Sequence, residues 1–255
     1  MNVTPDSFSD GGKYIHIDTA LHQIEKMISQ GADIIDIGGE STRPGANLVS
    51  ATEEMQRVIP LIKAIKQRFN IPVSIDTSKA SVMAAAIDAE VDMINDVRAL
   101  QNEGALAVVA QAALPICLMH MQGVPQSMQN NPHYNDVITD IIDFFKQRIA
   151  ACSLAGIATE RLLIDPGFGF GKTVQQNFRL LAQLAEFQSF KLPILVGLSR
   201  KSMIGKVLNC EVEQRLVGSV SAALLAAQNG ANILRVHDVK ATVEALKILN
   251  AMITA

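Results

Sequence analysis

Residues 71–76 read IPVSID and residues 91–96 read VDMIND. Each run is short, largely apolar and ends in Asp, a pattern typical of a parallel strand buried on both faces. Five other runs share this character, at 34–37, 114–119, 162–164, 194–198 and 233–236. Longer amphipathic stretches between the runs predict helices, for example over 18–30, 52–69, 136–155, 211–229 and 239–252. This alternation predicts an α/β fold in which helices connect parallel strands.

The number of strands points to a barrel. We count seven strand-like runs but eight helical stretches, because the helix at 18–30 precedes the first full strand. An open seven-stranded sheet would leave two unpaired edges, whereas a (β/α)8 TIM barrel leaves none. We therefore expect a TIM barrel whose first strand is truncated and lies before residue 1, with residues 1–3 as its tip. With 255 residues and no low-complexity linker, the chain is expected to form one domain over 1–255.

Composition argues against several classes of protein. Hydrophobic residues make up 49% of the chain and charged residues 18%, which suits a large core rather than a disordered chain. No apolar run reaches the roughly 18–20 residues of a membrane helix, and no signal peptide is expected. The net charge of −3 shows no block of like charge, so no nucleic-acid partner is expected. Cys117, Cys152 and Cys210 are far apart, which indicates reduced thiols of a cytoplasmic protein.

Polar residues follow nearly every apolar run. The residues in these places are Asp36, Asp76, Asn95, His120, Asp165, residues 199–201, Arg235 and His237. In a βα barrel the carboxyl ends of the strands meet at one mouth, where active sites lie. Any single residue of this kind could instead cap the next helix, but this explanation is weak for the whole set.

One part of this set consists of short side chains that accept hydrogen bonds, namely Asp76, Asn95 and Asp165. Buried carboxylates need donors, and an amino group beside a ring N–H supplies two parallel ones. The three residues therefore suit a pterin or guanine-like ring. The alternative is local: Asp76 could cap a helix near Ser78, and the other two could stabilise turns.

The second part is made of donors, namely Arg43, Lys201, Arg235 and His237. Arg235 and His237 are two residues apart at a strand end, so they point to the same side. Loops after the last two strands of this fold often hold phosphate, and Arg and Lys suit an anionic leaving group. A solvated or salt-bridged cluster is the alternative.

Residues 167–173, GFGFGKT, look like a nucleotide-binding P-loop. The P-loop spacing requires a glycine where Pro166 stands, so the motif fails. The five histidines also lack the spacing of a zinc site.

Seven motifs resemble, in chain order, those of the dihydropteroate synthases. They are 2–12 (NVTPDSFSDGG), 36–45 (DIGGESTRPG), 74–77 (SIDT), 94–97 (INDV), 165–172 (DPGFGFGK), 197–202 (GLSRKS) and 235–238 (RVHD). The match spans the whole chain, and an ordered set of seven motifs is far more specific than any one of them.

The resemblance implies roles for the matching residues. The pterin ring would contact Asp76, Asn95, Asp165 and Lys201, with Met119 nearby. The diphosphate region would contact Thr42, Arg43, Arg235, Val236 and His237, and Asn2 would bind Mg²⁺. The aminobenzoate would lie against Pro44, Phe170 and Ser199. Asp76, Asp165 and Lys201 are the expected catalytic residues.

The implied reaction transfers a dihydropterin-6-ylmethyl group from its diphosphate to 4-aminobenzoate. No Ser–His or Cys–His pair is evident in the sequence, which argues against a covalent enzyme intermediate. The resemblance further implies inhibition by sulfonamides and a homodimer, with small-molecule substrates and no membrane partner.

Two other functions remain open. A pterin-binding methyltransferase domain would share the acceptor trio, but it has no diphosphate for Arg43, Arg235 and His237 to bind. A catalytically silent barrel would serve for binding or dimerisation, and the absent first strand is its only support.

Overall fold

The computed structural model describes residues 13–41, 48–123, 128–129 and 131–255. The chain forms two compact units. Unit 1 comprises Met1–Met119 with Arg148–Leu162, and unit 2 comprises His120–Gln147 with Leu163–Ala255. A single domain over 1–255 therefore stays a prediction.

The strands of unit 1 form a parallel sheet in chain order. They are β1 (Ile35–Gly38), β2 (Val73–Asp76), β3 (Met93–Asp96) and β4 (Ile116–Met119). Every residue of β2, β3 and β4 is buried, which explains why these runs are largely apolar instead of alternating. The register places Asp76 beside Asn95 at the carboxyl ends of β2 and β3.

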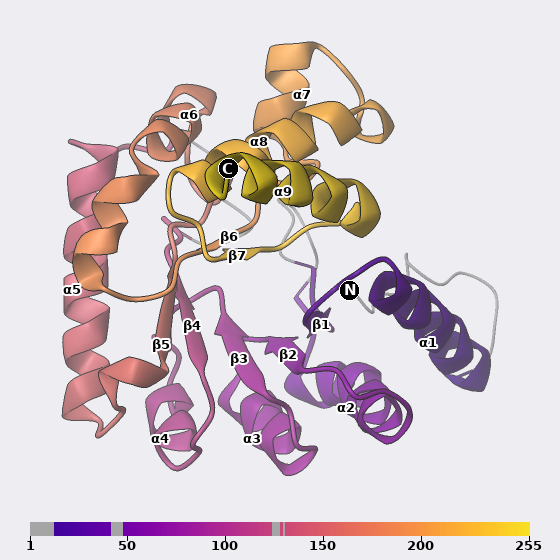
Figure 1. Ribbon diagram of the computed structural model, residues 1–255. Helices are drawn as coiled ribbons and strands as arrows, with labels where there is room; N and C mark the ends of the chain where they lie inside the picture. The colour runs from indigo at the N-terminus through magenta and orange to yellow at the C-terminus, as the bar shows by residue number, and fades with distance from the viewer. Residues whose placement is uncertain (1–12, 42–47, 124–127, 130) are drawn as a thin grey trace. The chain divides into compact units, whose positions relative to one another are not determined.

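Helices α2, α3 and α4 lie side by side along this sheet (Figure 1). The helices of unit 1 are α1 (Lys13–Ser29), α2 (Ala51–Arg68), α3 (Ala80–Asp88) and α4 (Ala105–Ala110). Ser50 caps α2, since its side chain accepts the backbone N–H of Glu53 at 3.2 Å. The buried stripe of α2, Val58, Leu61 and Ile65, has the three- and four-residue spacing of one helical face.

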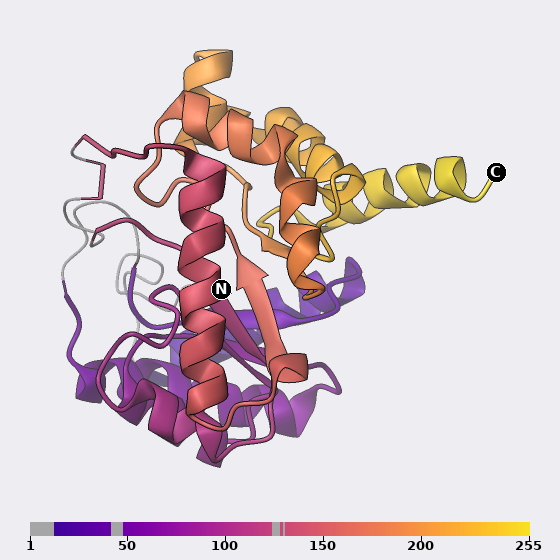
Figure 2. The same cartoon turned by 90° about the vertical axis from the view of Figure 1, so that its left-hand side faces the viewer.

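Unit 2 contains the remaining strands, also parallel. They are β5 (Leu162–Asp165), β6 (Leu195–Val196) and β7 (Ile233–Leu234). The first residue of β5, Leu162, belongs to unit 1. Ile164 bridges to Ile194 just before β6, and β6 pairs with β7. The α-helices are α5 (Val137–Leu154, whose last turns belong to unit 1), α6 (Val174–Ala182), α7 (Ser202–Leu208), α8 (Leu216–Gln228) and α9 (Val239–Ile253). Figure 2 shows α9 beside α8, and the last turns of α9 extend beyond α8.

The α/β class and the parallel strands are confirmed, and the alternating element order is that of a (β/α)8 barrel. The described part of the chain has seven strands and no closed ring of strands. The expected strand tip at 1–3 lies outside it. The helix predicted over 211–229 is in fact two elements, a 3₁₀ turn η4 (Val212–Gln214) followed by α8. Two further 3₁₀ turns, η2 (Thr159–Arg161) and η3 (Leu184–Phe190), precede β5 and β6.

No helix in the described ranges is long and apolar enough to span a bilayer.

Candidate active site

The carboxyl end of the unit 1 sheet carries buried acceptors. Asp76 and Asn95 are neighbours on β2 and β3, with only 8% and 4% of their surfaces exposed. The side-chain oxygen of Asn95 is buried and finds no hydrogen-bond partner among the described residues. A buried unpaired acceptor costs about 1–3 kcal/mol, so this oxygen suits a donor on a bound ligand. Met119 ends β4 and is also buried.

The next residue along β3 has a structural task. Successive strand residues point to opposite faces, so Asp96 faces away from Asn95. Its buried carboxylate accepts from Ser78 Oγ at 2.6 Å and from the backbone N–H groups of Arg98 at 2.8 Å and Leu100 at 2.7 Å. Asp96 therefore shapes the loop after β3, while Asn95 is left for the site.

An ion-pair cluster supports the segment after β1. Lys79 Nζ donates to Glu40 at 2.8 Å and also contacts Glu54, which is almost fully buried. The other oxygen of Glu40 accepts the backbone N–H of Val49 at 2.9 Å. Lys79 is not recognisable as part of this cluster from the sequence, because it is 39 residues from Glu40 and 25 from Glu54.

In unit 2, the acceptor is Asp165 at the end of β5. Its Oδ1 accepts the backbone N–H of Gly167 at 2.8 Å, and only 6% of the residue is exposed. Burial raises the pKa of Asp165, and the positive charge of Lys201 is the largest effect in the opposite direction. Burying this carboxylate therefore costs free energy, and a hydrogen bond from a donor on a bound ligand would offset part of that cost.

Lys201 and Phe170 are in direct contact. Lys201 directly precedes α7, and its Nζ donates to the carbonyl oxygen of Phe168. The same nitrogen lies 4.5 Å from the centroid of the Phe170 ring, a distance at which a cation is attracted to the aromatic face. The structure thus brings together one predicted pterin contact and one predicted aminobenzoate contact.

Ser199 and His237 form a pair that the sequence analysis missed. Ser199 Oγ lies 3.0 Å from Nδ1 of His237 and accepts its backbone N–H at 3.2 Å. This contact was not evident in the sequence, because the two residues are 38 positions apart. Partial burial, and then the charges of Arg235 and Arg200, lower the pKa of His237 to about 4. The ring is neutral at pH 7 and too weak a base to activate a serine.

A second pair joins the same two segments. Arg200 Nε and Nη2 donate to the two oxygens of Asp238 at 3.0 and 2.6 Å. Arg215 in turn donates to the carbonyl oxygen of Arg200 at 3.0 Å. Arg235 and Val236 follow β7 directly and are half-buried. The bidentate pair therefore fixes the segment after β6 against the segment after β7.

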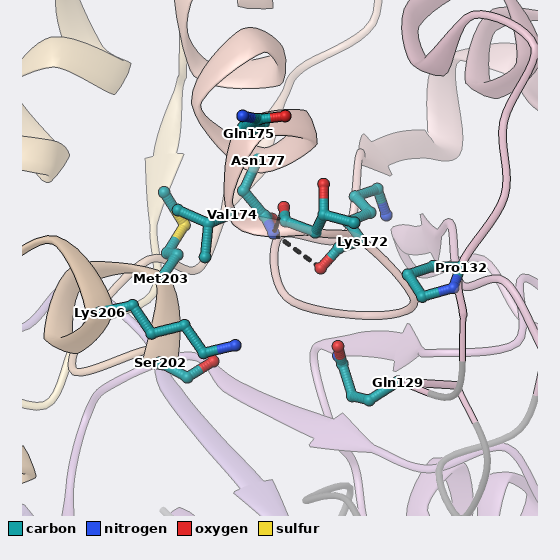
Figure 3. Close-up of a pocket in the computed structure, with 10 residues that line it drawn as sticks. Gln129, Pro132, Lys172, Val174, Gln175, Asn177, Ser202, Met203 and Lys206 are labelled. Atoms are coloured by element: carbon teal, nitrogen blue, oxygen red, sulfur yellow. Dashed lines mark hydrogen bonds between the residues drawn. The ribbon is translucent and has the colours of Figure 1, made fainter.

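A cavity of about 410 Å³ lies beside the glycine-rich segment 165–173 (Figure 3). Its lining includes Gln129, Lys172, Asn177, Ser202 and Lys206, all of unit 2. None of the predicted site residues lines it, so the cavity does not mark the predicted site.

Four predicted site residues, Asn2, Thr42, Arg43 and Pro44, lie outside the described residues. Within the described ranges, no three His, Cys, Asp or Glu side chains are grouped as metal ligands.

Comparison with known proteins decides the family. Residues 1–237 match the family described as pterin binding enzyme. The chain is 54% identical to the dihydropteroate synthase of Escherichia coli (strain K12), over 100% of this chain and 90% of that protein. The chain belongs to the dihydropteroate synthase family. The family resemblance stated from the seven motifs is thereby confirmed.

Two solved dihydropteroate synthases have the same fold. The Yersinia pestis enzyme in a sulfonamide complex is 55% identical, with a TM-score of 0.95 over 100% of this chain and 92% of that one. The Xanthomonas albilineans enzyme with 4-aminobenzoic acid is 50% identical, with a TM-score of 0.94 over 100% of this chain and 91% of that one.

Proposed function

We propose that this chain is a dihydropteroate synthase. It transfers the dihydropterin-6-ylmethyl group from (7,8-dihydropterin-6-yl)methyl diphosphate to 4-aminobenzoate, giving 7,8-dihydropteroate and diphosphate. The observation that carries the proposal is the 54% identity to a dihydropteroate synthase over the whole of this chain. The buried acceptors at the ends of β2, β3 and β5 fit it chemically.

The acceptors would bind the pterin ring. Asp76 and Asp165 can each accept from ring N–H and amino groups, while Asn95 can both accept and donate. The side-chain oxygen of Asn95, which has no partner among the described residues, would gain one from such a donor. Lys201, whose Nζ lies over the Phe170 ring, would add a positive charge near the pterin ring.

The diphosphate would be held by Arg235 and by His237, which can offer it a hydrogen bond. Mg²⁺ usually takes one or two protein oxygens besides phosphates and waters, so a site of this kind needs no carboxylate cluster. Asn2, with its amide oxygen, is proposed as that ligand. When bound, the ion would neutralise charge on the diphosphate.

The chemistry is a substitution at the exocyclic carbon, which becomes cation-like because the dihydropterin ring donates electrons to it. The C–O bond to the diphosphate breaks, and both electrons leave with the diphosphate. The lone pair of the 4-aminobenzoate nitrogen forms the new C–N bond, and that nitrogen then releases a proton to solvent. Asp76 and Asp165 offset the positive charge that develops on the pterin ring.

The 4-aminobenzoate would lie against Phe170, with Pro44 and Ser199 as further contacts. The Xanthomonas albilineans structure, solved with 4-aminobenzoic acid, supports a site of this kind in the family. The sulfonamide complex of the Yersinia pestis enzyme supports inhibition of this chain by sulfonamides.

We also propose that the chain forms a homodimer through the helices at the end of unit 2. Large apolar side chains are exposed there, namely Val207, Leu208, Leu216, Val217 and Leu225, and Ile248, Met252 and Ile253 on α9. Exposed apolar surface of this kind is usually covered by a partner. The cytoplasm is the proposed location, as expected from the wide spacing of the three cysteines along the sequence.

The test is product formation from the two substrates, first with Mg²⁺ and then with EDTA. The proposal expects 7,8-dihydropteroate with Mg²⁺ and a large loss with EDTA. A folded protein that gives no product with Mg²⁺ would refute the synthase activity, and undiminished product with EDTA would refute the metal requirement alone.

A further inference from the structure

The glycine-rich segment 165–171 has little conformational preference of its own. Gly167, Gly169 and Gly171 have backbone φ angles of 71°, 81° and 64°, values that residues other than glycine rarely adopt. Three such residues at alternate positions leave the free chain many shapes. The folded shape must therefore be imposed by contacts from outside the backbone of the segment.

Lys172 supplies contacts that are unusual for a lysine. Only 3% of the residue is exposed, and its Nζ lies 2.7 Å from the carbonyl oxygen of Gly167 and 3.1 Å from that of Phe170. The third neighbour is Nδ1 of His120, at 3.1 Å. The Nζ of Lys172 therefore has three hydrogen-bond partners within reach and can donate to both carbonyl oxygens.

His120 is the third hydrogen-bond partner of Lys172. Burial and the charge of Lys172 keep the pKa of the imidazole well below its usual range, so the ring is neutral. Its backbone N–H donates to the carbonyl oxygen of Asp165 at 2.9 Å, and its ring packs edge-on against Phe144 at 4.9 Å. His120 thus gives Lys172 a fixed anchor outside the segment.

We propose that Lys172 is a positioning residue for the transfer reaction: its buried amino group fixes segment 165–171 so that Asp165 and Phe170 keep defined places. The inference rests on the proposed function. Gly167 connects the two effects, because its N–H binds the Asp165 carboxylate and its carbonyl oxygen binds Lys172. Phe170 is fixed through its own carbonyl oxygen.

The direction of the side chain agrees with this role. Lys172 and Lys206 both line the cavity of Figure 3, but the Lys172 side chain turns away from Lys206 and toward the buried acceptors. Lys206 is exposed on α7 and is therefore a matched control for the loss of one lysine charge at this cavity.

The test compares Lys172→Met with Lys206→Met in the full chain by two measurements. The first is amide hydrogen exchange, which needs no activity: peptides covering 165–173 should exchange about ten-fold faster in Lys172→Met only. The second is steady-state kinetics with both substrates. There kcat/KM should fall about ten-fold or more in Lys172→Met, and KM for 4-aminobenzoate should rise because Phe170 is no longer held.

Lys172→Gln keeps two N–H donors and should recover part of both effects, and it replaces Lys172→Met if that variant does not fold. Unchanged exchange over 165–173, or kinetics equal to Lys206→Met, would overturn the inference. If the wild-type chain makes no product, the proposed function fails, but the exchange measurement still decides whether Lys172 holds the segment.

Discussion

Asp165 is a residue whose buried carboxylate lowers the stability of the fold but is expected to contact a ligand. Its pKa is raised by burial, so the folded state binds its proton more tightly than the unfolded state does. By linkage, this group destabilises the fold increasingly as the pH rises from its ordinary pKa of about 3.9 through the raised value. The carboxylate is therefore kept in place at an energetic cost, as expected for a residue that meets a ligand.

We predict that Asp165→Asn lowers kcat/KM about 100-fold, because the charge opposite the pterin is lost. The melting temperature at pH 7 should stay equal or rise, because the buried charge is removed. Initial rates and thermal unfolding test the two halves separately. A variant that turns over normally would exclude the assigned role, and one that melts much lower would show that Asp165 is mainly structural.

Ser199 should not act as a nucleophile. Its partner His237 has a pKa of about 4 and is a poor general base at neutral pH. Ser199→Ala should therefore cost about ten-fold or less in kcat, the loss of one or two hydrogen bonds. Loss of a true nucleophile would cost about 10⁶-fold. Rates and mass spectrometry of the quenched enzyme distinguish the cases, and a covalent adduct on Ser199 would contradict this prediction.

At the scale of elements, the two strand-end segments of unit 2 are joined by Arg200 and Asp238. Both side chains are partly exposed, so we expect a coupling free energy of only about 1 kcal/mol in a double-mutant cycle of Arg200→Ala and Asp238→Ala. Each single variant should lower kcat/KM for the diphosphate substrate several-fold, and the double variant should be no worse. Strictly additive losses would show that the pair does not act as a unit.

The loop after β3 depends on a different carboxylate. Asp96→Ala would remove the acceptor of two backbone N–H groups and of the Ser78 hydroxyl, all partly or fully buried. We expect a loss of about 2–4 kcal/mol in the free energy of unfolding, measured by denaturant titration. Asp96→Asn keeps one acceptor oxygen and should lose less. Equal losses in the two variants would show that the charge, and not the hydrogen bonds, matters.

The elements also show what the sequence could predict. Strand ends such as Asp76, Asn95 and Asp165 were found because apolar runs and their polar ends are local patterns. Contacts such as Lys172 with His120, 52 residues apart, or Arg200 with Asp238, 38 apart, were not found because no local pattern records them. The predicted strands at 194–198 and 233–236 are longer than β6 and β7. The apolar residues Leu198 and Val236 extended the predicted runs, but they lie beyond the last paired positions.

For the whole molecule, the exposed apolar side chains of α7, α8 and α9 predict self-association. Val217 is 75% exposed and lies on α8. Val217→Glu should shift the chain from dimer to monomer in light scattering, with its helix content unchanged, because it would place a charge in an apolar interface. Lys240→Glu on α9 is a control for adding negative charge to an exposed helix position. A wild-type chain that is already monomeric at micromolar concentration would refute the proposed dimer.

The glycines of segment 165–171 also limit how this protein can evolve. A methyl group added at Gly167 would meet the carbonyl oxygen of His120 at 1.8 Å, and one at Gly171 would meet that of Gln122 at 2.7 Å. Neither position can change without rebuilding its surroundings. A lineage exposed to a drug that competes with 4-aminobenzoate therefore has few viable escape routes through these glycines. Under the proposed function, heritable resistance would instead have to arise at side chains that contact the drug, of which Phe170 is the proposed example.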